Sequence, residues 1–421
     1  MPDKIQSPKG THDILPPEAR RWQVAEESIR KMMDIFGYGE IRTPVFEKSE
    51  LFARGVGETS DIVSKEMYTF SDKGDTSLTL KPEITAPVIR SFIQHNLGKK
   101  SPMTKLYYID HAFRQERPQA GRFRQFHQYG VEAIGSHQPE MDVEVISLAT
   151  ESLIALGLDG LTLKLNSIGE TKSRKKFRKA LKTFLQPHFN ELSEASQKRF
   201  EVNPLRILDS KNLEEQKLLQ DAPNISEFLD DNDKAHFSDV CEGLTQCGIP
   251  FELDSTLVRG LDYYTRTTFE ITSTALGAQD AVCGGGRYDG LVETLGGPST
   301  PAIGFAAGIE RILLCLESKN ESTADSQIQV YFIAHGDVAR EIVIPLIHAS
   351  RQIGVQSDFD PIRRSLKAQF REANRIGAEF AVIIGDSEIQ AKEAQIKNLE
   401  TGDQMSIKFD DLGGYLASLQ I

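Results

Sequence analysis

The sequence predicts an α+β protein with a mainly antiparallel sheet flanked by helices, a helical insertion and a C-terminal α/β domain. Two strand-like segments, Thr104–Phe113 and Arg124–Ile134, flank a polar loop and alternate between two faces, which is typical of antiparallel pairing. A charged helical block with few β-branched residues then interrupts the strands between about 170 and 243. Strand-like sequence resumes at Phe251, and strands and helices alternate near the C-terminus.

Composition indicates a multidomain protein that is not embedded in a membrane. A chain of 421 residues favours two to four domains, and 39% apolar with 26% charged residues is typical of globular proteins. No apolar run approaches the roughly twenty residues of a transmembrane helix, and the start of the chain lacks the apolar core of a signal peptide. We therefore expect a cytoplasmic protein with no membrane partner.

The first elements follow from spacing and turn chemistry. Apolar residues recur at helical intervals over Pro16–Phe36, which opens on prolines and is followed by Gly37. We then expect a strand at Glu40–Phe46, a Gly-rich connection through Gly55–Gly57 and a hairpin over Tyr68–Leu80 that turns at 73–75.

The strand Arg124–Ile134 carries polar residues on one face. Alternation places four side chains together there: Phe126, Gln128, Gly130 and Glu132. A buried amide and carboxylate need a polar partner such as an amino-acid ligand, although a partly exposed edge strand would also accommodate them.

Beyond the helical block, we expect strand-like sequence from Phe251 through LVRGLDYY and the Gly-rich stretch. A strand in Pro298–Ala307 and a helix at Ile309–Leu316 are expected to follow. The polar stretch Glu317–Gln327 resembles a linker. Beyond it the pattern predicts a mainly parallel sheet, from strands and helices at Val330–Ala334, Val338–Ile353, Val355–Phe359, Arg364–Ile376 and Phe380–Gly385. The expected domains are 1–169, 170–243 (helical insertion), 244–320 and 328–421.

Charge and cysteine content limit the function classes. A net charge of −12 argues against non-specific nucleic-acid binding, but two basic runs, Lys172–Lys182 and Arg363–Arg375, could meet phosphates locally. Each run is also compatible with a solvated helix face. The four cysteines have no zinc-ligand spacing, so we expect reduced thiols and no metal site built from protein ligands alone.

Two segments carry the most chemistry. Leu257–Glu270 (LVRGLDYYTRTTFE) brings Arg259, a glycine turn and two phenols together, and Gly284–Leu291 (GGGRYDGL) sets bare backbone beside a cation, a phenol and a carboxylate. Each alone is equally compatible with a strand end or a loop that needs positive φ angles. In this order, the two segments resemble the histidine-specific signatures of the histidyl-tRNA synthetases, a class II aminoacyl-tRNA synthetase family.

Further segments extend the resemblance over nearly the whole chain. Lys9–Pro16 (KGTHDILP) is similar to the family's amino-terminal signature, and Pro16–Glu47 resembles the dimer-forming motif 1 with Pro44 in place. The resemblance thus implies a class II catalytic domain, a C-terminal anticodon-binding domain that contains the basic run Arg363–Arg375, and a homodimer.

Two further motifs imply ATP binding. The segment around Arg114 resembles motif 2, which would place Arg114 on the α-phosphate and Glu116 near the adenine. Gly304–Arg311 (GFAAGIER) resembles motif 3, with Arg311 at the γ-phosphate. Arg259 would lie between the substrate carboxylate and the α-phosphate. The resemblance implies three catalytic arginines, supplemented by Mg²⁺, and no covalent nucleophile.

The resemblance also implies a histidine pocket. Glu83 and Thr85, in LKPEITAPVIR, would bind the α-ammonium group. The imidazole ring would contact Glu132 and Tyr264 at its nitrogens, with Gln128 and Tyr288 completing the pocket. The sequence departs from many relatives at Lys81 and Ile84, where arginine and glycine are common, and this puts a phosphate role for position 81 in doubt.

Other residues are implied to meet the tRNA. Arg117 and Gln119, in the motif 2 loop, would contact the acceptor end of a histidine tRNA, and Lys172–Lys182 could touch the acceptor stem. The implied activity is ATP-dependent ligation of L-histidine to its tRNA through histidyl-adenylate. The alternatives are a synthetase-like histidine-binding regulatory subunit of ATP phosphoribosyltransferase, a degenerate tRNA-sensing domain of a stress kinase, and ligand binding without chemistry.

Overall fold

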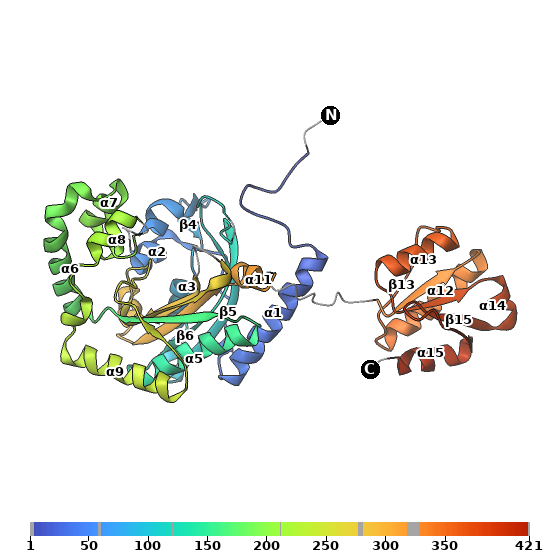
Figure 1. The fold of residues 1–421 in the computed structure, drawn as a ribbon. Helices are drawn as coiled ribbons and strands as arrows, with labels where there is room; N and C mark the ends of the chain where they lie inside the picture. Colours follow the sequence, from blue (N-terminus) through green and yellow to red (C-terminus); the bar gives the residue numbers. More distant parts are fainter. Residues whose placement is uncertain are drawn as a thin grey trace. The chain divides into compact units, whose positions relative to one another are not determined.

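The chain forms two compact units, Met1–Glu321 and Ser322–Ile421 (Figure 1). The structure, a computed structural model, describes residues 4–57, 60–119, 121–210, 212–276, 281–317 and 328–419. Of the expected linker Glu317–Gln327, only Glu317 lies within the described residues, where it ends a helix. None of the helices in the described ranges is both long and apolar enough to cross a membrane.

A mixed, mainly antiparallel sheet organises the first unit. Within the described ranges its strand order is β1-β5-β6-β11-β10-β9-β7-β8. The central strands, antiparallel to one another, are β5 (Thr104–Phe113), β6 (Gln125–Ile134), β11 (Ala302–Gly308), β10 (Ala281–Arg287), β9 (Thr265–Ser273) and β7 (Leu161–Ser167). Two short parallel strands, β1 (Gly39–Glu40) and β8 (Glu252–Leu253), form the edges. The predicted antiparallel pair Thr104–Phe113 and Arg124–Ile134 is confirmed.

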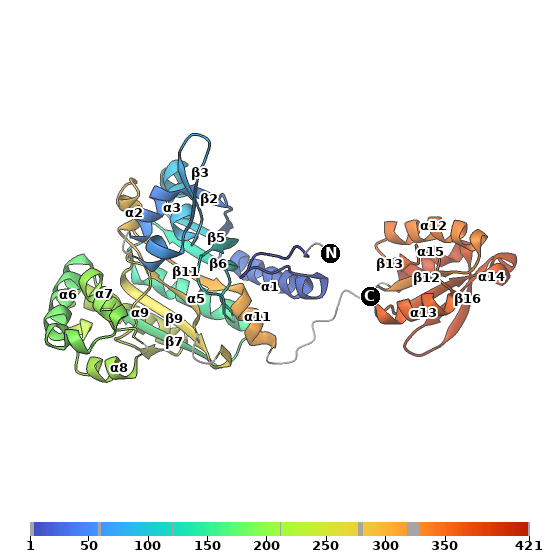
Figure 2. The same ribbon diagram turned by 90° about the horizontal axis from the view of Figure 1, so that it is seen from above.

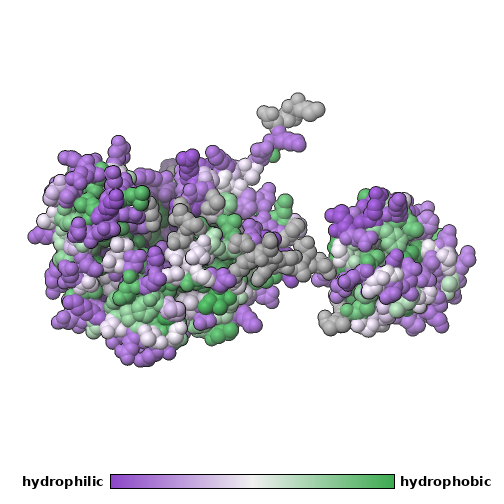
Figure 3. All heavy atoms as spheres, in the orientation of Figure 1, coloured by the Kyte–Doolittle hydropathy of each residue, from purple (hydrophilic) through white to green (hydrophobic). Residues whose placement is uncertain are grey.

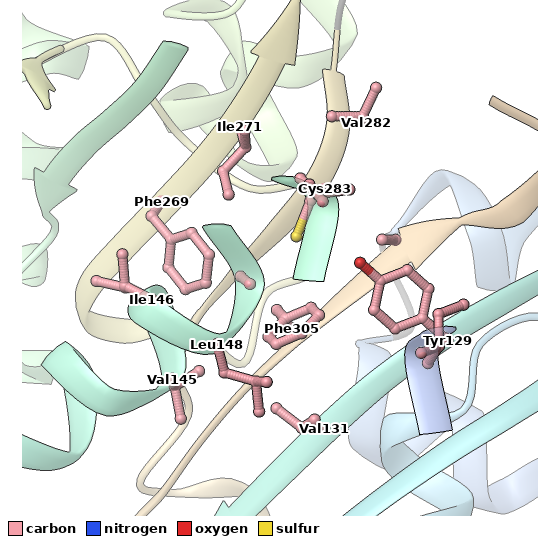
Figure 4. Close-up of a cluster of buried hydrophobic side chains, with 14 of the residues drawn as sticks. Tyr129, Val131, Val145, Ile146, Leu148, Phe269, Ile271, Val282, Cys283 and Phe305 are labelled. Atoms are coloured by element: carbon pink, nitrogen blue, oxygen red, sulfur yellow. The ribbon is translucent and has the colours of Figure 1, made fainter. Parts of the chain in front are cut away.

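One face of this sheet supports the main hydrophobic core. Side chains from β6, β9 and β11, such as Val131, Phe269 and Phe305, pack against helices of this face (Figure 4). The helices are α1 (Pro16–Ile35), α5 (Pro139–Ala155), α9 (Asp231–Gln246) and α11 (Ile309–Glu317). The amphipathic helix predicted from Pro16 is confirmed, and it buries Trp22 and Met33. Because strand residues alternate, the neighbours Gln128 and Glu132 point to the opposite face.

The helical block has a small core of its own. It comprises α6 (Thr171–Leu185), α7 (Glu194–Val202) and α8 (Leu213–Leu219), with short 3-10 turns at Gln186–Glu191, Pro204–Ile207 and Ile225–Glu227. Phe177, Leu181 and Phe200 are buried there, and Tyr264 joins the same cluster. Figure 2 shows α6, α7 and α8 gathered at the β9–β7 end of the sheet. The last helix of the block, α9, instead packs into the main core through Val240 and Leu244.

Two local predictions near the N-terminus were wrong. Glu40–Phe46 is not one strand, because Glu40 ends β1 in the large sheet while Phe46 begins β2 (Phe46–Lys48) in a separate three-stranded sheet. The expected Gly-rich connection is largely α2 (Ser49–Val56). Gly55 is buried in it, and a Cβ added there would lie 3.3 Å from the Ala86 Cβ. The hairpin is confirmed as β3 (Tyr68–Ser71) and β4 (Ser77–Leu80). Helices α3 (Thr85–Gln94), α4 (Leu97–Lys100) and α10 (Leu291–Thr294) complete this region.

The predicted strand through LVRGLDYY was also wrong. Residues 254–264 form turns and bends, and β9 begins only at Thr265. An Asp254–Leu257 turn closes with a Leu257 N–H to Asp254 carbonyl bond of 3.0 Å, which ends the short β8 pairing. The Gly-rich stretch, in contrast, is the central strand β10.

The second unit begins as predicted and then differs. Its first elements are β12 (Val330–Ala334), α12 (Asp337–Gln352), β13 (Ser357–Phe359), α13 (Leu366–Arg375) and β14 (Phe380–Ile384), and these strands are parallel. The following elements, which the sequence analysis missed, are α14 (Asp386–Ala391), β15 (Glu393–Asn398), β16 (Gln404–Lys408) and α15 (Phe409–Ser418). Because β15 and β16 pair antiparallel, the sheet is mixed rather than mainly parallel.

Candidate active site

A cavity of about 470 Å³ opens on the face of the large sheet opposite the core helices. Its walls come from β6, β10 and β11, from the loop after β5 and from the loop before β9. Both polar stretches singled out in the sequence therefore reach the same cavity. Its lining includes Arg114, Arg259 and Arg311 together.

Gly284 on β10 and Gly304 on β11 line the floor of the cavity, and Gly130 on β6 lies on the neighbouring strand. A Cβ at Gly284 would lie 2.2 Å from the Arg259 guanidinium, and one at Gly304 would lie 2.1 Å from Glu132 Oε2. On β6, a Cβ at Gly130 would lie 2.4 Å from the Tyr108 hydroxyl. Real Cβ atoms do not approach so closely, so bare backbone is what gives these three polar groups their room.

Arg259 is anchored on one side and open on the other. Its Nη1 donates to Glu270 Oε2 at 2.6 Å, and its guanidinium lies 6.0 Å from the centre of the Tyr264 ring. Within the described part of the chain, its buried Nε has no hydrogen-bond partner. Glu270, on β9, was not identified from the sequence, and a carboxylate amid the alternating apolar residues of a central strand is the signal that could have revealed it.

Arg114 and Arg311 each donate a hydrogen bond to a backbone carbonyl. Arg114 Nε donates to the Pro82 carbonyl at 2.9 Å, and Arg311 Nη1 donates to the Ala281 carbonyl at 2.6 Å. Burial lowers the pKa of both guanidinium groups, which shows that each charge is partly desolvated. A cavity wall with such cations suits a polyanionic ligand. Glu116 also lines the cavity, 3.6 Å from Arg122.

Two buried carboxyl groups lie at the inner end. Both oxygens of Glu83 accept backbone N–H bonds of 2.9 Å at the start of α3, from Thr85 and Ala86, and burial raises the Glu83 pKa to about 7. Burial raises the Glu132 pKa to about 8. Glu132 Oε2 accepts a hydrogen bond from the Tyr288 hydroxyl. Its other oxygen, Oε1, is buried and has no hydrogen-bond partner among the residues described.

The structure brings most of the predicted histidine set together. Lining the cavity are Glu83, Thr85, Gln128, Tyr264 and Tyr288. Glu132 instead lies one layer behind the wall, next to Gly304 and Tyr288. Tyr108, Tyr263 and Glu66 also line the cavity, and the sequence analysis did not assign them a role.

Three predicted or questioned positions lie elsewhere. Arg117 and Gln119 are exposed on the loop between β5 and β6 and do not line the cavity. Lys81 is fully buried, ion-paired with Asp110 and bonded to the Thr43 carbonyl at 3.2 Å. Lys81 does not line the cavity. Having lysine rather than arginine at this position therefore removes no cation from the cavity wall.

Arg287 is structural rather than cavity-facing. Its guanidinium is fully buried and donates to Asp142 Oδ2, with Nε 2.8 Å and Nη2 2.6 Å away. It also bonds the Ser136 and Gln138 carbonyls at 2.8 and 2.9 Å. Arg287 therefore fixes the end of β10 immediately before Tyr288.

Each of the two basic runs keeps some exposed cations. On α6, Lys175, Arg178, Lys179 and Lys182 line a shallow groove, and hydrophilic side chains predominate over α6 and α7 in Figure 3. In the other run, Arg364 and Arg375 both pair with Glu372, at 3.1 Å for Arg364. Lys367 and Arg371 remain exposed on α13.

The described residues hold no cluster of three or more histidine, cysteine, aspartate or glutamate side chains that could bind a metal ion. Within the same ranges, the four cysteines are free thiols, two of them buried.

The mixed sheet, its glycine floor and its arginine-lined cavity define a class II aminoacyl-tRNA synthetase. A family model for histidyl-tRNA synthetase matches residues 10–312, and a model for an anticodon binding domain matches residues 329–419. The chain belongs to the histidyl-tRNA synthetase family.

Individual relatives match over nearly their whole length. The histidine–tRNA ligase of Chloroherpeton thalassium is 51% identical over 97% of both chains, and that of Geobacillus kaustophilus is 48% identical over 98% of both. The crystal structure of apo histidyl-tRNA synthetase from Staphylococcus aureus has a TM-score of 0.83 at 38% identity, covering 98% of this chain and all of that one.

Proposed function

We propose that the protein ligates L-histidine to its tRNA in two steps, using ATP and releasing AMP and pyrophosphate. The observation that carries this proposal is the meeting of Arg114, Arg259 and Arg311 in one cavity with the buried carboxyl groups at its inner end. Relatives named histidine–tRNA ligase, similar over 97% of their length, support the same activity.

In the first step, a histidine carboxylate oxygen attacks the α-phosphorus of ATP and pyrophosphate leaves, giving histidyl-adenylate. In the second step, a 3′-terminal hydroxyl of the tRNA attacks the adenylate carbonyl and AMP leaves. The first step needs in-line positioning of the attacking oxygen at phosphorus, and the second needs the hydroxyl held over the face of the carbonyl carbon. Both need groups that stabilise developing charge rather than a protein nucleophile. We assign Arg114 to the α-phosphate, Arg311 to the γ-phosphate end and Arg259 to the space between the α-phosphate and the histidine carboxylate. Glu116 would lie near the adenine.

We assign histidine recognition to the inner end of the cavity. Glu83 and Thr85 would bind the α-ammonium group, because Glu83 offers a buried carboxyl there. Tyr264, Gln128 and Tyr288 would surround the ring. Glu132 lies behind Tyr288, so it would act on a ring nitrogen through that hydroxyl or through its unpartnered Oε1. A site that satisfies both nitrogens can reject analogues by about 10⁴–10⁵.

Mg²⁺ would enter with the nucleotide. Proteins usually hold Mg²⁺ through one or two carboxylates plus phosphate oxygens, so a dedicated protein cage is not required. Glu270 lines the cavity alongside the arginines and fits that role. When bound, Mg²⁺ would offset charge on the departing pyrophosphate.

The remaining contacts concern the tRNA and the assembly. Arg117 and Gln119, exposed beside the cavity mouth, would meet the acceptor end, and the second unit would bind the anticodon. The groove on α6 would contact the acceptor stem. We further propose a cytoplasmic homodimer with domains 1–169, 170–243, 244–320 and 328–421.

A second candidate is a histidine-binding regulatory subunit of ATP phosphoribosyltransferase. A Bacillus halodurans structure described as such a regulatory subunit or histidyl-tRNA synthetase has a TM-score of 0.65 and covers 88% of this chain, but at 22% identity it shows the fold alone. The cavity arginines and the match to an anticodon binding domain favour the ligase.

Aminoacylation of tRNA with each amino acid in turn tests the proposal. We expect charging with histidine only. Charging with a different amino acid, or with none, contradicts it, and a histidine-dependent effect on ATP phosphoribosyltransferase activity would support the regulatory candidate instead.

A further inference from the structure

The loop that carries Arg259 and Tyr264 lies outside the strands of the sheet. Residues 254–264 form turns and bends between β8 and β9, and Leu257 and Tyr264 are buried among them. Buried carbonyl groups need donors, and a loop without a strand neighbour must obtain them from side chains. Asn166 of β7 donates to the Ser255 and Leu257 carbonyls. The helical block supplies the donors for the later carbonyls of the loop, those of Gly260, Asp262 and Tyr264.

Arg174, on the inner side of α6, holds the end of the loop. Its Nη1 donates to the Tyr264 carbonyl and lies 3.4 Å from the Asp262 carbonyl. Burial lowers the pKa of Arg174, so the charged group has given up part of its hydration to make these bonds. A planar guanidinium can serve two such carbonyls at once.

The turn Pro204–Ile207 holds the middle of the loop. Arg206 Nη2 donates to the Gly260 carbonyl, next to Arg259, and Arg206 Nη1 lies 3.3 Å from Asp61 Oδ2 on the facing wall of the cavity. The neighbouring Asn203 donates its Nδ2 proton to Asp262 Oδ1 at 2.8 Å. Three side chains of one block therefore fix the loop at both ends of the segment Arg259–Tyr264.

We propose that Arg174, Asn203 and Arg206 are positioning residues for histidine activation, acting through the loop that places Arg259 and Tyr264. This proposal rests on the proposed function. The ATP-facing arginines, Arg114 and Arg311, are fixed by other elements and do not depend on these bonds.

The test is histidine-dependent ATP–pyrophosphate exchange in the full-length protein, with Arg174→Ala, Arg206→Ala and the conservative Arg174→Lys. We expect the alanine variants to lower kcat about 10- to 100-fold and to raise KM for histidine, since an ångström of misplacement can cost about 100-fold. KM for ATP should stay within about twofold of wild type. Arg174→Lys should retain part of the activity lost in Arg174→Ala, because a lysine ammonium keeps the positive charge but not the planar guanidinium that can donate to two carbonyls.

Lys198→Ala, at an exposed position on α7 of the same block, is the matched control and should exchange at the wild-type rate. Active-site titration and thermal unfolding would show how much of each variant is folded. Unchanged kinetics in the alanine variants would overturn the positioning role, as would a loss that merely follows the folded fraction with both KM values unchanged. Failure of the unmodified protein to exchange with histidine would instead contradict the proposed function itself.

Discussion

The Arg259 guanidinium occupies the space that a side chain at Gly284 would need. A Cβ at Gly284 would lie 2.2 Å from Nη2 and 2.4 Å from Nη1 of Arg259. The first glycine of GGGRYDG is therefore required by a cation supplied from a different segment. This relationship joins the two sequence stretches into one site.

Gly284→Ala should displace Arg259 and disable activation without unfolding the protein. Loss of one preorganised charge donor typically lowers the rate about 10²- to 10³-fold, and we expect a loss of that size in histidine-dependent pyrophosphate exchange. Gly290→Ala is the matched control, because a Cβ at Gly290 would meet no atom within 4 Å. Near-normal exchange in Gly284→Ala would show that Arg259 does not need this space.

Burial of Glu132 should make stability depend on pH. Burial raises its folded pKa to about 8 from the usual 4.5, so between these values the folded protein keeps a proton that the unfolded chain has released. Stability contributed by this group is thus complete below about pH 4.5 and falls as the pH rises to about 8.

Glu132→Gln removes that titration while keeping an acceptor for the Tyr288 hydroxyl. We expect the melting temperature of the variant, relative to wild type, to be higher at pH 8 than at pH 5. Calorimetry at both pH values measures the difference. An offset that is the same at the two pH values would mean that Glu132 titrates normally in the folded state.

Lys81→Met tests whether position 81 serves structure or ATP. The substitution leaves Asp110, which is only 12% exposed, without its partner, and breaking a buried ion pair costs about 3–5 kcal/mol. We expect urea denaturation to report a loss near the lower end of that range, with KM for ATP nearly unchanged in the folded variant. A large rise in KM for ATP without loss of stability would restore a phosphate role for Lys81.

Local sequence patterns were sufficient to predict elements that satisfy their own hydrogen bonds or whose apolar residues recur at a clear period. The helix from Pro16, the hairpin over Tyr68–Leu80 and the pair β5–β6 were predicted because periodicity and turn residues determine them. The α6 and α13 helices lie where the charged helical block and the alternating C-terminal pattern predicted helices.

The failures share a cause in long-range partners. Glu40 and Phe46 belong to different sheets because β5 and β4, far along the chain, pair with them. The loop 254–264 resembled a strand, but side chains from the helical block and from β7 supply donors to its carbonyls. Lys81 faces Asp110 rather than the cavity, and Glu270 reaches Arg259 only after β9 and β10 pair. These contacts join segments that are distant in the sequence, so local sequence patterns do not predict them.

Histidine-dependent ATP–pyrophosphate exchange by wild type and Arg259→Ala, measured without tRNA, tests the central claim most directly. We predict exchange with histidine alone among the amino acids for the wild type, and a loss of about 10²- to 10³-fold or more in the variant with its fold intact. Exchange at the wild-type rate in folded Arg259→Ala would contradict the assignment of this arginine and of the site around it.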